Sequence, residues 1–273
     1  MFIEDGSTHS RAFQKPLRGE HTSYSQVDTY NRCPRKWAFR YHLKLDSESV
    51  SHYLVFGGAI HRTLARIYAK KQLTNEPMAV EEACDHFADD WDQSIEDAGP
   101  GLVNWEDTDK DALQAKGLGM IEEFAKLPLV LEVVGVEKEF RLDLTDEVTG
   151  EVMDKHMLGY IDALVLVDGE LVVHEHKTAA RKWAQSRIDN DLQASIYQWA
   201  TGASRVTFNV LMKTVKPRVD CYHTERSESQ MREAVHVAVS ALKAQKAGIF
   251  PAKRDWHCRG CEFARQCEDR GAI

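Results

Sequence analysis

Hydrophobic positions along the chain recur with the helical period in some segments, and with period two or without interruption in others. Helical spacing predicts helices over residues 57–71, 78–97, 107–127, 186–200 and 228–247, with shorter ones capped by Ser25 and begun by Pro34. Apolar runs predict strands over 130–144, 158–167, 170–177, 204–213 and 218–224. This order predicts an α/β fold, with a mixed central β-sheet flanked by helices and a helical insertion over 72–128.

The strongest local signal is Asp168-Gly169, which lies between two β-rich runs and is typical of a two-residue hairpin turn. If these residues form the turn, Val167 pairs with Glu170. In the same register, Asp162 lies opposite Glu175. Both faces of the hairpin are largely apolar, which is typical of strands in the middle of a covered sheet. The sequence therefore places two carboxylates, about 5 Å apart at their Cβ atoms, in an apolar setting.

Two such carboxylates need a compensating positive charge, because like charges placed opposite each other are destabilising and burial of unpaired charge is costly. A divalent cation between Asp162 and Glu175 would supply it, and Mg²⁺ and Mn²⁺ both prefer carboxylate oxygens. The alternative is a structural ion cluster in which Lys177, two residues after Glu175, neutralises the acids. The direct opposition and the apolar flanks favour the cation.

The strand over 130–144 is predicted to bury one side only. Val134, Val136, Phe140 and Leu142 alternate onto the predicted buried side, and Glu137 and Glu139 onto the other. Either glutamate could reach a second metal ion, but a solvated strand face is the favoured interpretation.

The composition is that of an ordinary globular protein, since 43% of the 273 residues are hydrophobic and 29% are charged. No apolar run approaches the ~20 residues that cross a membrane, and the first residues lack the apolar core of a signal peptide. A cytoplasmic protein without a membrane partner is therefore expected. Residues 1–22 are polar and aperiodic, which predicts a flexible leader before a single domain over 23–273.

The formal net charge of −8 argues against a protein coated in basic surface, but it does not exclude a local nucleic-acid groove. Basic residues cluster in three groups: Arg32, Arg35, Lys36, Arg40 and Lys44; Arg181, Lys182 and Arg187; and Lys213, Lys216 and Arg218. Each group can be a solvated surface. The first two are interleaved with Trp37, Phe39, Tyr41 and Trp183, and aromatic rings of this kind stack on bases in single-strand-binding proteins.

Several short motifs follow one another along the chain. The segment Gly159-Tyr160-Ile161-Asp162 precedes Glu175-His176-Lys177, and the pair resembles the core of the PD-(D/E)XK nuclease superfamily. His61 after Gly57-Gly58, and Gln193-xxx-Tyr197 after the hairpin, are similar to the flanking motifs of its RecB-like branch. One motif alone is weak, whereas the ordered set is specific. The resemblance spans roughly residues 23–267 and implies a nuclease built on a restriction-endonuclease-like core.

The resemblance also implies roles for these residues. Asp162 and Glu175 would bind the catalytic metal, together with the backbone carbonyl of His176. His61 would add a nitrogen ligand, which favours Mn²⁺ over the harder Mg²⁺; taken alone, it would be interpreted as an ordinary histidine at a helix edge. Lys177 would position and help deprotonate the attacking water, and burial and nearby positive charge are expected to depress its pKa.

Gln193 and Tyr197 lie at positions i and i+4, so they share one face of the helix predicted after the hairpin. The resemblance implies that they bind the substrate by holding the nucleotide strand beside the metal. Spacing alone fits a polar rim beside apolar residues equally well.

The cysteines form a second pattern. Cys258, Cys261 and Cys267 fall within ten residues, in a C-terminal region over 248–267. This spacing is typical of a metal-ligand triplet, because disulfides are not expected in a cytosolic protein. Spacing alone leaves zinc and an iron–sulfur cluster about equally favoured. Cys84 and Cys221 are interpreted as ordinary buried thiols.

The resemblance decides between the two metals. Ser25, with Tyr30, Cys33 and Pro34 after it, is similar to the N-terminal signature of the RecB-like branch. Some members of that branch, including the AddB helicase-nuclease subunit and CRISPR-associated nucleases, carry a 4Fe–4S cluster bound by one early cysteine and a late triplet. Cys33 and the three late cysteines match that pattern, which implies a structural cluster that joins the two ends of the domain.

These features together predict a divalent-metal-dependent DNA exonuclease that acts mainly on single-stranded DNA or resected ends, in recombination, repair, phage DNA processing or CRISPR adaptation. No GxxxxGK[ST] motif occurs, so the chain is expected to be a stand-alone nuclease or the nuclease partner of a helicase or recombination protein. One rival is a non-catalytic iron–sulfur or zinc protein that binds DNA or a partner on a nuclease scaffold. Another is a structure-specific or restriction-type endonuclease. The intact set of Asp162, Glu175 and Lys177 argues against the first rival.

Overall fold

A six-stranded mixed sheet forms the centre of the computed structural model, which describes residues 21–47, 49–106 and 108–269. Its strands are β1 (His21–Thr22), β4 (Glu132–Leu142), β5 (His156–Val167), β6 (Glu170–Ala179), β7 (Arg205–Met212) and β8 (Arg218–Thr224). Strands β4, β5 and β6 are antiparallel neighbours, β6 and β7 are parallel, and β8 runs antiparallel to β7. The predicted α/β fold class is confirmed. The predicted leader lies outside the described residues except for its last two, which form β1.

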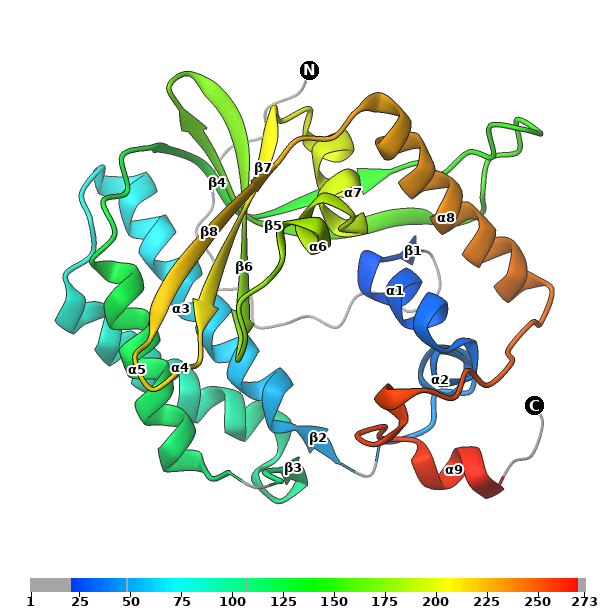
Figure 1. Ribbon diagram of the computed structural model, residues 1–273, viewed down its shortest axis with the longest axis horizontal. Helices are drawn as coiled ribbons and strands as arrows, with labels where there is room; N and C mark the ends of the chain where they lie inside the picture. Colours follow the sequence, from blue (N-terminus) through cyan, green and yellow to red (C-terminus); the bar gives the residue numbers. More distant parts are fainter. Residues whose placement is uncertain (1–20, 48, 107, 270–273) are drawn as a thin grey trace.

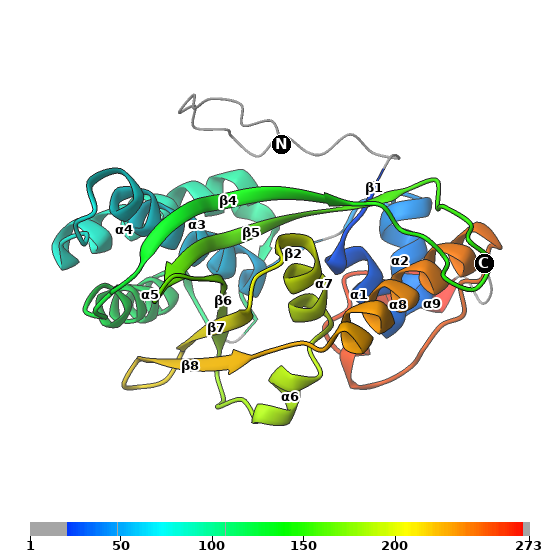
Figure 2. The same ribbon diagram turned by 90° about the horizontal axis from the view of Figure 1, so that it is seen from above.

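Helices cover both faces of this sheet. They are α1 (Tyr24–Arg32), α2 (Pro34–Trp37), α3 (His52–Thr74), α4 (Val80–Ala98), α5 (Lys110–Ala125), α6 (Gln185–Asp189), α7 (Leu192–Thr201), α8 (Glu228–Lys246) and α9 (Ala264–Asp269). Short turns η1 (Ala38–His42), η2 (Pro100–Leu102) and η3 (Trp256–Cys258) and a two-stranded pair of β2 (Val50–Ser51) and β3 (Val103–Asn104) complete the described elements. Figures 1 and 2 show α3, α4 and α5 grouped together, away from α1, α2, α8 and α9.

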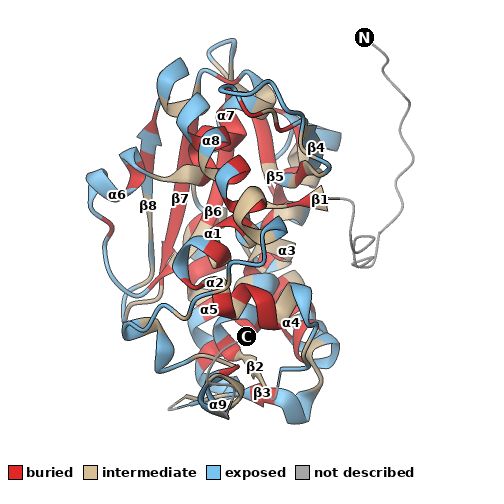
Figure 3. Ribbon diagram, turned by 90° about the vertical axis from the view of Figure 1, so that its right-hand side faces the viewer, coloured by how far each residue is buried: buried red, intermediate tan, exposed pale blue. Residues whose placement is uncertain are grey.

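Each group of helices has its own apolar core against the sheet. The α3–α5 side buries Phe56, Tyr68, Trp91 and Phe124 against one face, and the α1, α7 and α8 side packs against the other face. In Figure 3 most positions of β6 and β7 are buried, whereas β8 mixes buried, intermediate and exposed positions. The strands that carry the predicted site, β5 and β6, thus lie in the covered middle of the sheet.

No helix among the described residues is long and apolar enough to cross a membrane.

The predicted hairpin turn is present between β5 and β6. Asp168 and Gly169 have φ values of +53° and +82°, as a two-residue turn that matches the twist of the strands requires. Val167 pairs with Glu170, and the same register continues to Ala163 opposite His174. Register and turn are both confirmed over this stretch.

The predicted pairing of Asp162 with Glu175 falls one step beyond the observed ladder. The β5–β6 ladder ends at Ala163 and His174, and the Asp162 carboxylate accepts a hydrogen bond of 2.7 Å from the backbone N–H of His176. Beyond this point β6 continues beside β7 as far as Ala179. The aspartate side chain thus occupies the place where the two strands separate.

Strand β4 also departs from the predicted alternation. A register shift between Val133 and Gly135 moves Val133 to a buried position, with 7% exposure, and leaves Val134 40% exposed. Such a bulge sets two residues opposite one and exchanges the faces of the side chains on either side of it. The predicted buried side, which included Val134, is therefore wrong at that end of the strand, whereas Phe140 and Leu142 do pack against the core.

Two helix boundaries differ from the prediction because of polar side chains. The helix predicted over 186–200 is divided into α6 and α7, since Asp191 caps α7 by accepting hydrogen bonds from the backbone of Gln193 and Ala194. Its predicted end at Gly202 is confirmed, with a φ of +68°. At α1 the N-cap is Ser23, whose hydroxyl accepts from the backbone N–H of Gln26, and not Ser25 as predicted.

Candidate active site

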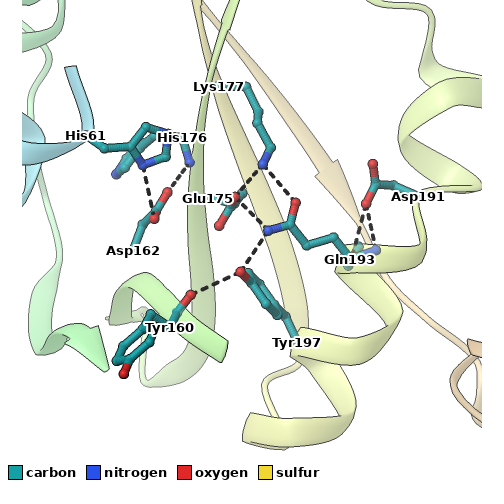
Figure 4. A network of polar contacts seen from close by, with 10 residues as sticks. His61, Tyr160, Asp162, Glu175, His176, Lys177, Asp191, Gln193 and Tyr197 are labelled. Atoms are coloured by element: carbon teal, nitrogen blue, oxygen red, sulfur yellow. Dashed lines mark hydrogen bonds and ion pairs between the residues drawn. The ribbon is translucent and has the colours of Figure 1, made fainter. Parts of the chain in front are cut away.

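Side chains from four elements meet where β5 and β6 separate. His61 comes from α3 and Asp162 from β5, the segment from Glu175 to Lys177 from β6, and Gln193 and Tyr197 from α7 (Figure 4). Their hydrogen bonds form two groups, one centred on Asp162 and one on Glu175. All the residues predicted for the catalytic centre thus lie in one region of the fold.

Both carboxylate oxygens of Asp162 have partners. His61 Nδ1 lies 3.2 Å from Oδ1, and the backbone N–H of His176 donates to Oδ2. Burial lowers the pKa of His61, but the negative charge of Asp162 outweighs it and raises that pKa to about 9. Burial likewise opposes ionisation of Asp162, yet the charge of His61 holds the pKa of Asp162 well below its ordinary range. At neutral pH the two form an ion pair in the metal-free protein.

The second group is centred on one oxygen of Glu175. Lys177 Nζ donates to Glu175 Oε1 at 2.6 Å, and Gln193 Nε2 donates to the same oxygen at 2.9 Å. Lys177 also donates to Gln193 Oε1 at 2.8 Å. Tyr197 accepts from Gln193 at 2.7 Å and donates to the carbonyl of Tyr160 at 3.0 Å. Figure 4 shows this chain of contacts running from α7 to the end of β6.

Glu175 is buried in an incomplete environment. It is 2% exposed, and its Oε2 atom has no hydrogen-bond partner among the described residues. Burial, and then the negative charge of Asp162, raise the pKa of Glu175 above its ordinary value. A buried, unpartnered carboxylate oxygen beside a second carboxylate is a donor set that suits a divalent cation.

The expected depression of the Lys177 pKa is not seen in the metal-free protein. Burial does lower it, but attraction to the Glu175 carboxylate is stronger, so the pKa of Lys177 lies above its ordinary value. The sequence-based expectation included burial and nearby positive charge, both of which lower the pKa of Lys177. The negative charge of Glu175, two residues away, reverses the direction.

The imidazole of His176 lies on the face of β6 opposite the Glu175 and Lys177 side chains, with its ring centroid 6.3 Å from that of His61. It is buried between Tyr68 and Phe124, with ring centroids 5.2 and 5.5 Å from them. Burial lowers the pKa of His176 to about 3, so the ring is neutral. Only the backbone of His176 faces Asp162, and the role predicted for its carbonyl stays a prediction.

Glu137 belongs to this region, although the sequence favoured a solvated strand face for it. In the β4–β5 ladder, Val136 pairs with Ala163 and Lys138 with Ile161, which leaves Glu137 beside Asp162. Its φ of +47° is in the left-handed region that favours glycine. Desolvation by the surrounding protein, and then the negative charge of Asp162, raise the pKa of Glu137 to about 7, while the residue as a whole is exposed, as predicted. The register of the hairpin, extended to the preceding strand, is the signal that could have found it.

The arrangement is not a finished metal site. Within residues 21–47, 49–106 and 108–269, no three His, Cys, Asp or Glu side chains are grouped closely enough to hold an ion. The Asp162 and Glu175 carboxylates still suit a divalent cation, because both are oxygen donors and Glu175 Oε2 has no hydrogen-bond partner among the described residues.

Comparison with known proteins decides the family. The sequence model of the PD-(D/E)XK nuclease superfamily matches residues 21–268, a span that contains the whole described sheet and every residue of the site. The chain belongs to the PD-(D/E)XK nuclease superfamily. Nucleases of this superfamily use divalent metals such as Mg²⁺ or Mn²⁺.

Solved structures resemble this PD-(D/E)XK chain in fold. One is a protein from Eubacterium rectale that is described as an exonuclease by assignment. It is 13% identical, and the match covers 99% of this chain and 95% of that protein with a TM-score of 0.52. SSO0001 is 18% identical, with a TM-score of 0.41 over 87% of this chain and 95% of its own. No curated protein matches the sequence. At this identity the likeness to the Eubacterium rectale protein concerns the fold alone.

The PD-(D/E)XK chain has a second place where predicted ligands meet. Cys33, Cys258, Cys261 and Cys267 all line one pocket of about 80 Å³, together with residues that include Lys36 and Phe39. Cys33 is buried at the junction of α1 and α2, whereas Cys258 is exposed. The cysteines thus share a pocket without forming a closed metal site among the described residues. The interpretation of Cys221 as a buried thiol is wrong, because it is exposed on β8, and Cys84 is only partly buried.

Proposed function

We propose that the chain is a divalent-metal-dependent deoxyribonuclease of the RecB-like branch that works as an exonuclease on DNA ends, mainly on single strands. One observation carries the proposal: Glu175 has one oxygen held by Lys177, and its other oxygen is buried beside Asp162 with no partner in the part of the chain that the structure describes. A fold that needed only an internal ion cluster would satisfy both oxygens. The incomplete carboxylate instead suits a site that takes up an ion during function.

Each side chain has a proposed role. Asp162 and Glu175 bind the metal, with His61 and the His176 carbonyl as further ligands. A divalent cation bound there would lower the pKa of an attacking water and neutralise charge on the scissile phosphate. Lys177, fixed by Glu175 at 2.6 Å, keeps an ammonium group at the site and orients the water by donating a hydrogen bond.

The approach of the substrate is proposed to run along α3. His61 follows Gly57 and Gly58, and a Cβ atom at either glycine would meet nothing within 4 Å. Tyr53 comes four residues before Gly57 on the same helix and is 53% exposed. Its ring centroid lies 4.7 Å from Lys213 Nζ. Exposed rings beside cations are typical of surfaces that bind single strands, because rings stack on bases and cations pair with phosphates.

The cysteine pocket is proposed to bind a 4Fe–4S cluster through Cys33, Cys258, Cys261 and Cys267, with zinc as the alternative. Their common pocket supports a shared ligand. Cys33 follows α1, and the other three lie in the C-terminal region, so the cluster would join the two ends of the domain. Iron and sulfide analysis of protein purified without oxygen tests this, and a colourless protein with one zinc per chain would overturn it.

A digestion assay tests the nuclease proposal. Linear single strands labelled at the 5′ or the 3′ end, and a single-stranded circle, are incubated with Mn²⁺ and either the wild type or Asp162→Asn. The proposal expects mononucleotides or short products from linear strands, intact circles and no digestion by the variant. Cutting of circles would favour an endonuclease. Equal inactivity of wild type and variant on all substrates would leave the non-catalytic scaffold as the better interpretation.

A further inference from the structure

Gln193 directs its whole side-chain amide into the protein. The residue is 6% exposed. Its Oε1 accepts from Lys177, and its Nε2 donates to Glu175 Oε1 and to the Tyr197 hydroxyl, at 2.8, 2.9 and 2.7 Å. Figure 4 shows the amide between Lys177, Glu175 and Tyr197. This geometry does not fit a residue whose main task is to contact a nucleotide strand.

The partners define the orientation of the amide. An ammonium group only donates hydrogen bonds, so the Gln193 atom that faces Lys177 is the oxygen. A carboxylate only accepts, so the nitrogen faces Glu175. The Tyr197 hydroxyl then accepts from this nitrogen and donates to the Tyr160 carbonyl on β5, at 3.0 Å. Donation therefore runs from Lys177 through Gln193 and Tyr197 to the backbone of β5, with a second branch from Gln193 to Glu175.

We propose that Gln193, anchored by Tyr197, is a positioning residue that determines which oxygen of Glu175 faces the metal. Oε1 is occupied by two donors, Lys177 and Gln193. Oε2 has none among the described residues and is the oxygen left for a cation. The inference rests on the proposed metal-dependent function and assigns Gln193 and Tyr197 a role through Glu175 in place of direct contact with the substrate.

Loss of the amide would release both partners. The terminal torsion of a glutamate is broad, so Glu175 would be free to turn either oxygen towards the ion. Lys177 would lose one of its two acceptors. Partners that orient metal ligands typically contribute 10–100-fold to metal affinity or activity, which sets the size of the expected effect.

The experiment compares two glutamines of α7. Gln193→Leu removes the proposed contact, and Gln198→Leu is the matched control. Gln198 is 8% exposed, and among the described residues its amide forms hydrogen bonds with the backbone of Ser204 and Arg226 only. Mn²⁺ binding to the DNA-free protein is measured by titration calorimetry. Gln193→Leu is expected to weaken Mn²⁺ binding by about 10–100-fold. Gln198→Leu is expected to lower the melting temperature and to leave Mn²⁺ affinity unchanged.

Steady-state kinetics give the second measurement. A positioning role predicts that Gln193→Leu lowers kcat while KM for DNA stays the same. A strand-holding role predicts a higher KM and unchanged Mn²⁺ affinity, and that outcome overturns the inference. Tyr197→Phe keeps the ring packed on Phe140 and removes only the hydroxyl. It should weaken Mn²⁺ binding in the same direction by a smaller factor, which gives a test if Gln193→Leu does not fold.

The controls separate this inference from the proposed function. Wild type should bind Mn²⁺, and Asp162→Asn should not. If wild type binds no Mn²⁺, the metal-dependent function and this inference fail together. If wild type binds Mn²⁺ and both Gln193→Leu and Tyr197→Phe bind it equally well, only the inference fails.

Discussion

The candidate active site and the cysteine pocket differ in how much of their arrangement the polypeptide supplies. At the active site, Asp162 and Glu175 are fixed by hydrogen bonds from a histidine, a lysine, an amide and the backbone. The cysteine pocket is lined by Cys33 and by residues from turns and short helices near the C-terminus, with Cys258 exposed. A preformed site binds its ion with little change in folding, whereas a loosely held ligand set gains its structure from the bound group. We therefore expect metal loss to affect catalysis at one site and stability at the other.

The largest effect is expected at the cysteine pocket. If the pocket binds the proposed cluster and Cys258→Ala prevents its binding, the variant should lower the free energy of unfolding by about 4–5 kcal/mol, the magnitude for opening a cross-link that closes a loop of more than 100 residues. Denaturant unfolding measures it, together with the iron or zinc content. Cys84→Ala is the matched control, because Cys84 is partly buried on α4 and does not line the pocket. Equal stability of the two variants would remove the basis of the comparison.

The next largest effect is expected on the activity of the candidate active site. Asp162→Asn should reduce DNA digestion by more than about 100-fold, the upper range for residues that only support a metal ligand. Its stability should change far less than that of Cys258→Ala, because an asparagine oxygen can still accept from the backbone of His176. Digestion rates and melting curves recorded on the same samples check both statements. If Asp162→Asn unfolds, the expectation that this site affects activity more than stability is contradicted.

The shifted pKa values of three histidines in and beside the active site predict how the stability of the protein depends on pH. His61 has a pKa raised to about 9, so its contribution to stability is complete below pH 6.5 and is lost as the pH rises through 9. Burial lowers the pKa of His174 and His176 to about 4 and 3, so their contribution grows as the pH rises towards 6.5. The histidine contribution in metal-free protein should therefore be greatest near pH 6.5.

Thermal melts between pH 5 and 9, with and without Mn²⁺, measure this dependence. Because a metal-binding imidazole must lose its proton, stabilisation by Mn²⁺ should increase with pH. His61→Asn should abolish the loss of stability above pH 6.5. An unchanged profile in that variant would refute the His61–Asp162 ion pair.

The hairpin shows what local sequence can determine. Asp168-Gly169 and the apolar runs beside it were enough to predict the turn and the register as far as Ala163 opposite His174. The separation of the strands at Asp162 could not be predicted in the same way, because it depends on a side-chain contact with the backbone of His176. The division of the helix at Asp191 has the same cause, a polar side chain that takes over a backbone hydrogen bond.

The site shows a second limit. The proximity of His61, 101 residues before Asp162, came from the motif resemblance, since no period or propensity relates α3 to β5. The exposure of Glu137 was predicted correctly, but its place beside Asp162 was missed, because that follows from the pairing of β4 with β5. The burial of Gln193 was also missed. Helical spacing shows which residues share one face of a helix, but it does not show whether that face contacts the protein core or the substrate. Tertiary packing decides such questions, and one sequence carries little information about it.

Glu137 offers a smaller test at the active site. A non-glycine residue in the left-handed region costs about 1–2 kcal/mol, so Glu137→Gly should stabilise the protein and Glu137→Ala should not. If the carboxylate contributes to cation binding beside Asp162, both variants should bind Mn²⁺ more weakly in calorimetry. Val134→Ala is a control on the same strand at an exposed position. Equal stability of the glycine and alanine variants would argue against backbone strain at this position.

The smallest effect separates helix stability from substrate approach. Gly58 lies inside α3, where glycine costs about 1 kcal/mol relative to alanine, yet no packing requires it, since a Cβ there would meet nothing within 4 Å. Gly58→Ala should therefore raise the free energy of unfolding by up to about 1 kcal/mol. If the DNA strand passes over this surface to reach His61, the same methyl group should raise KM for single-stranded DNA while Mn²⁺ affinity stays unchanged. A variant that is more stable and equally active would show that the substrate approaches from another side, and the two measurements together decide whether the exposed glycine serves the fold or the substrate.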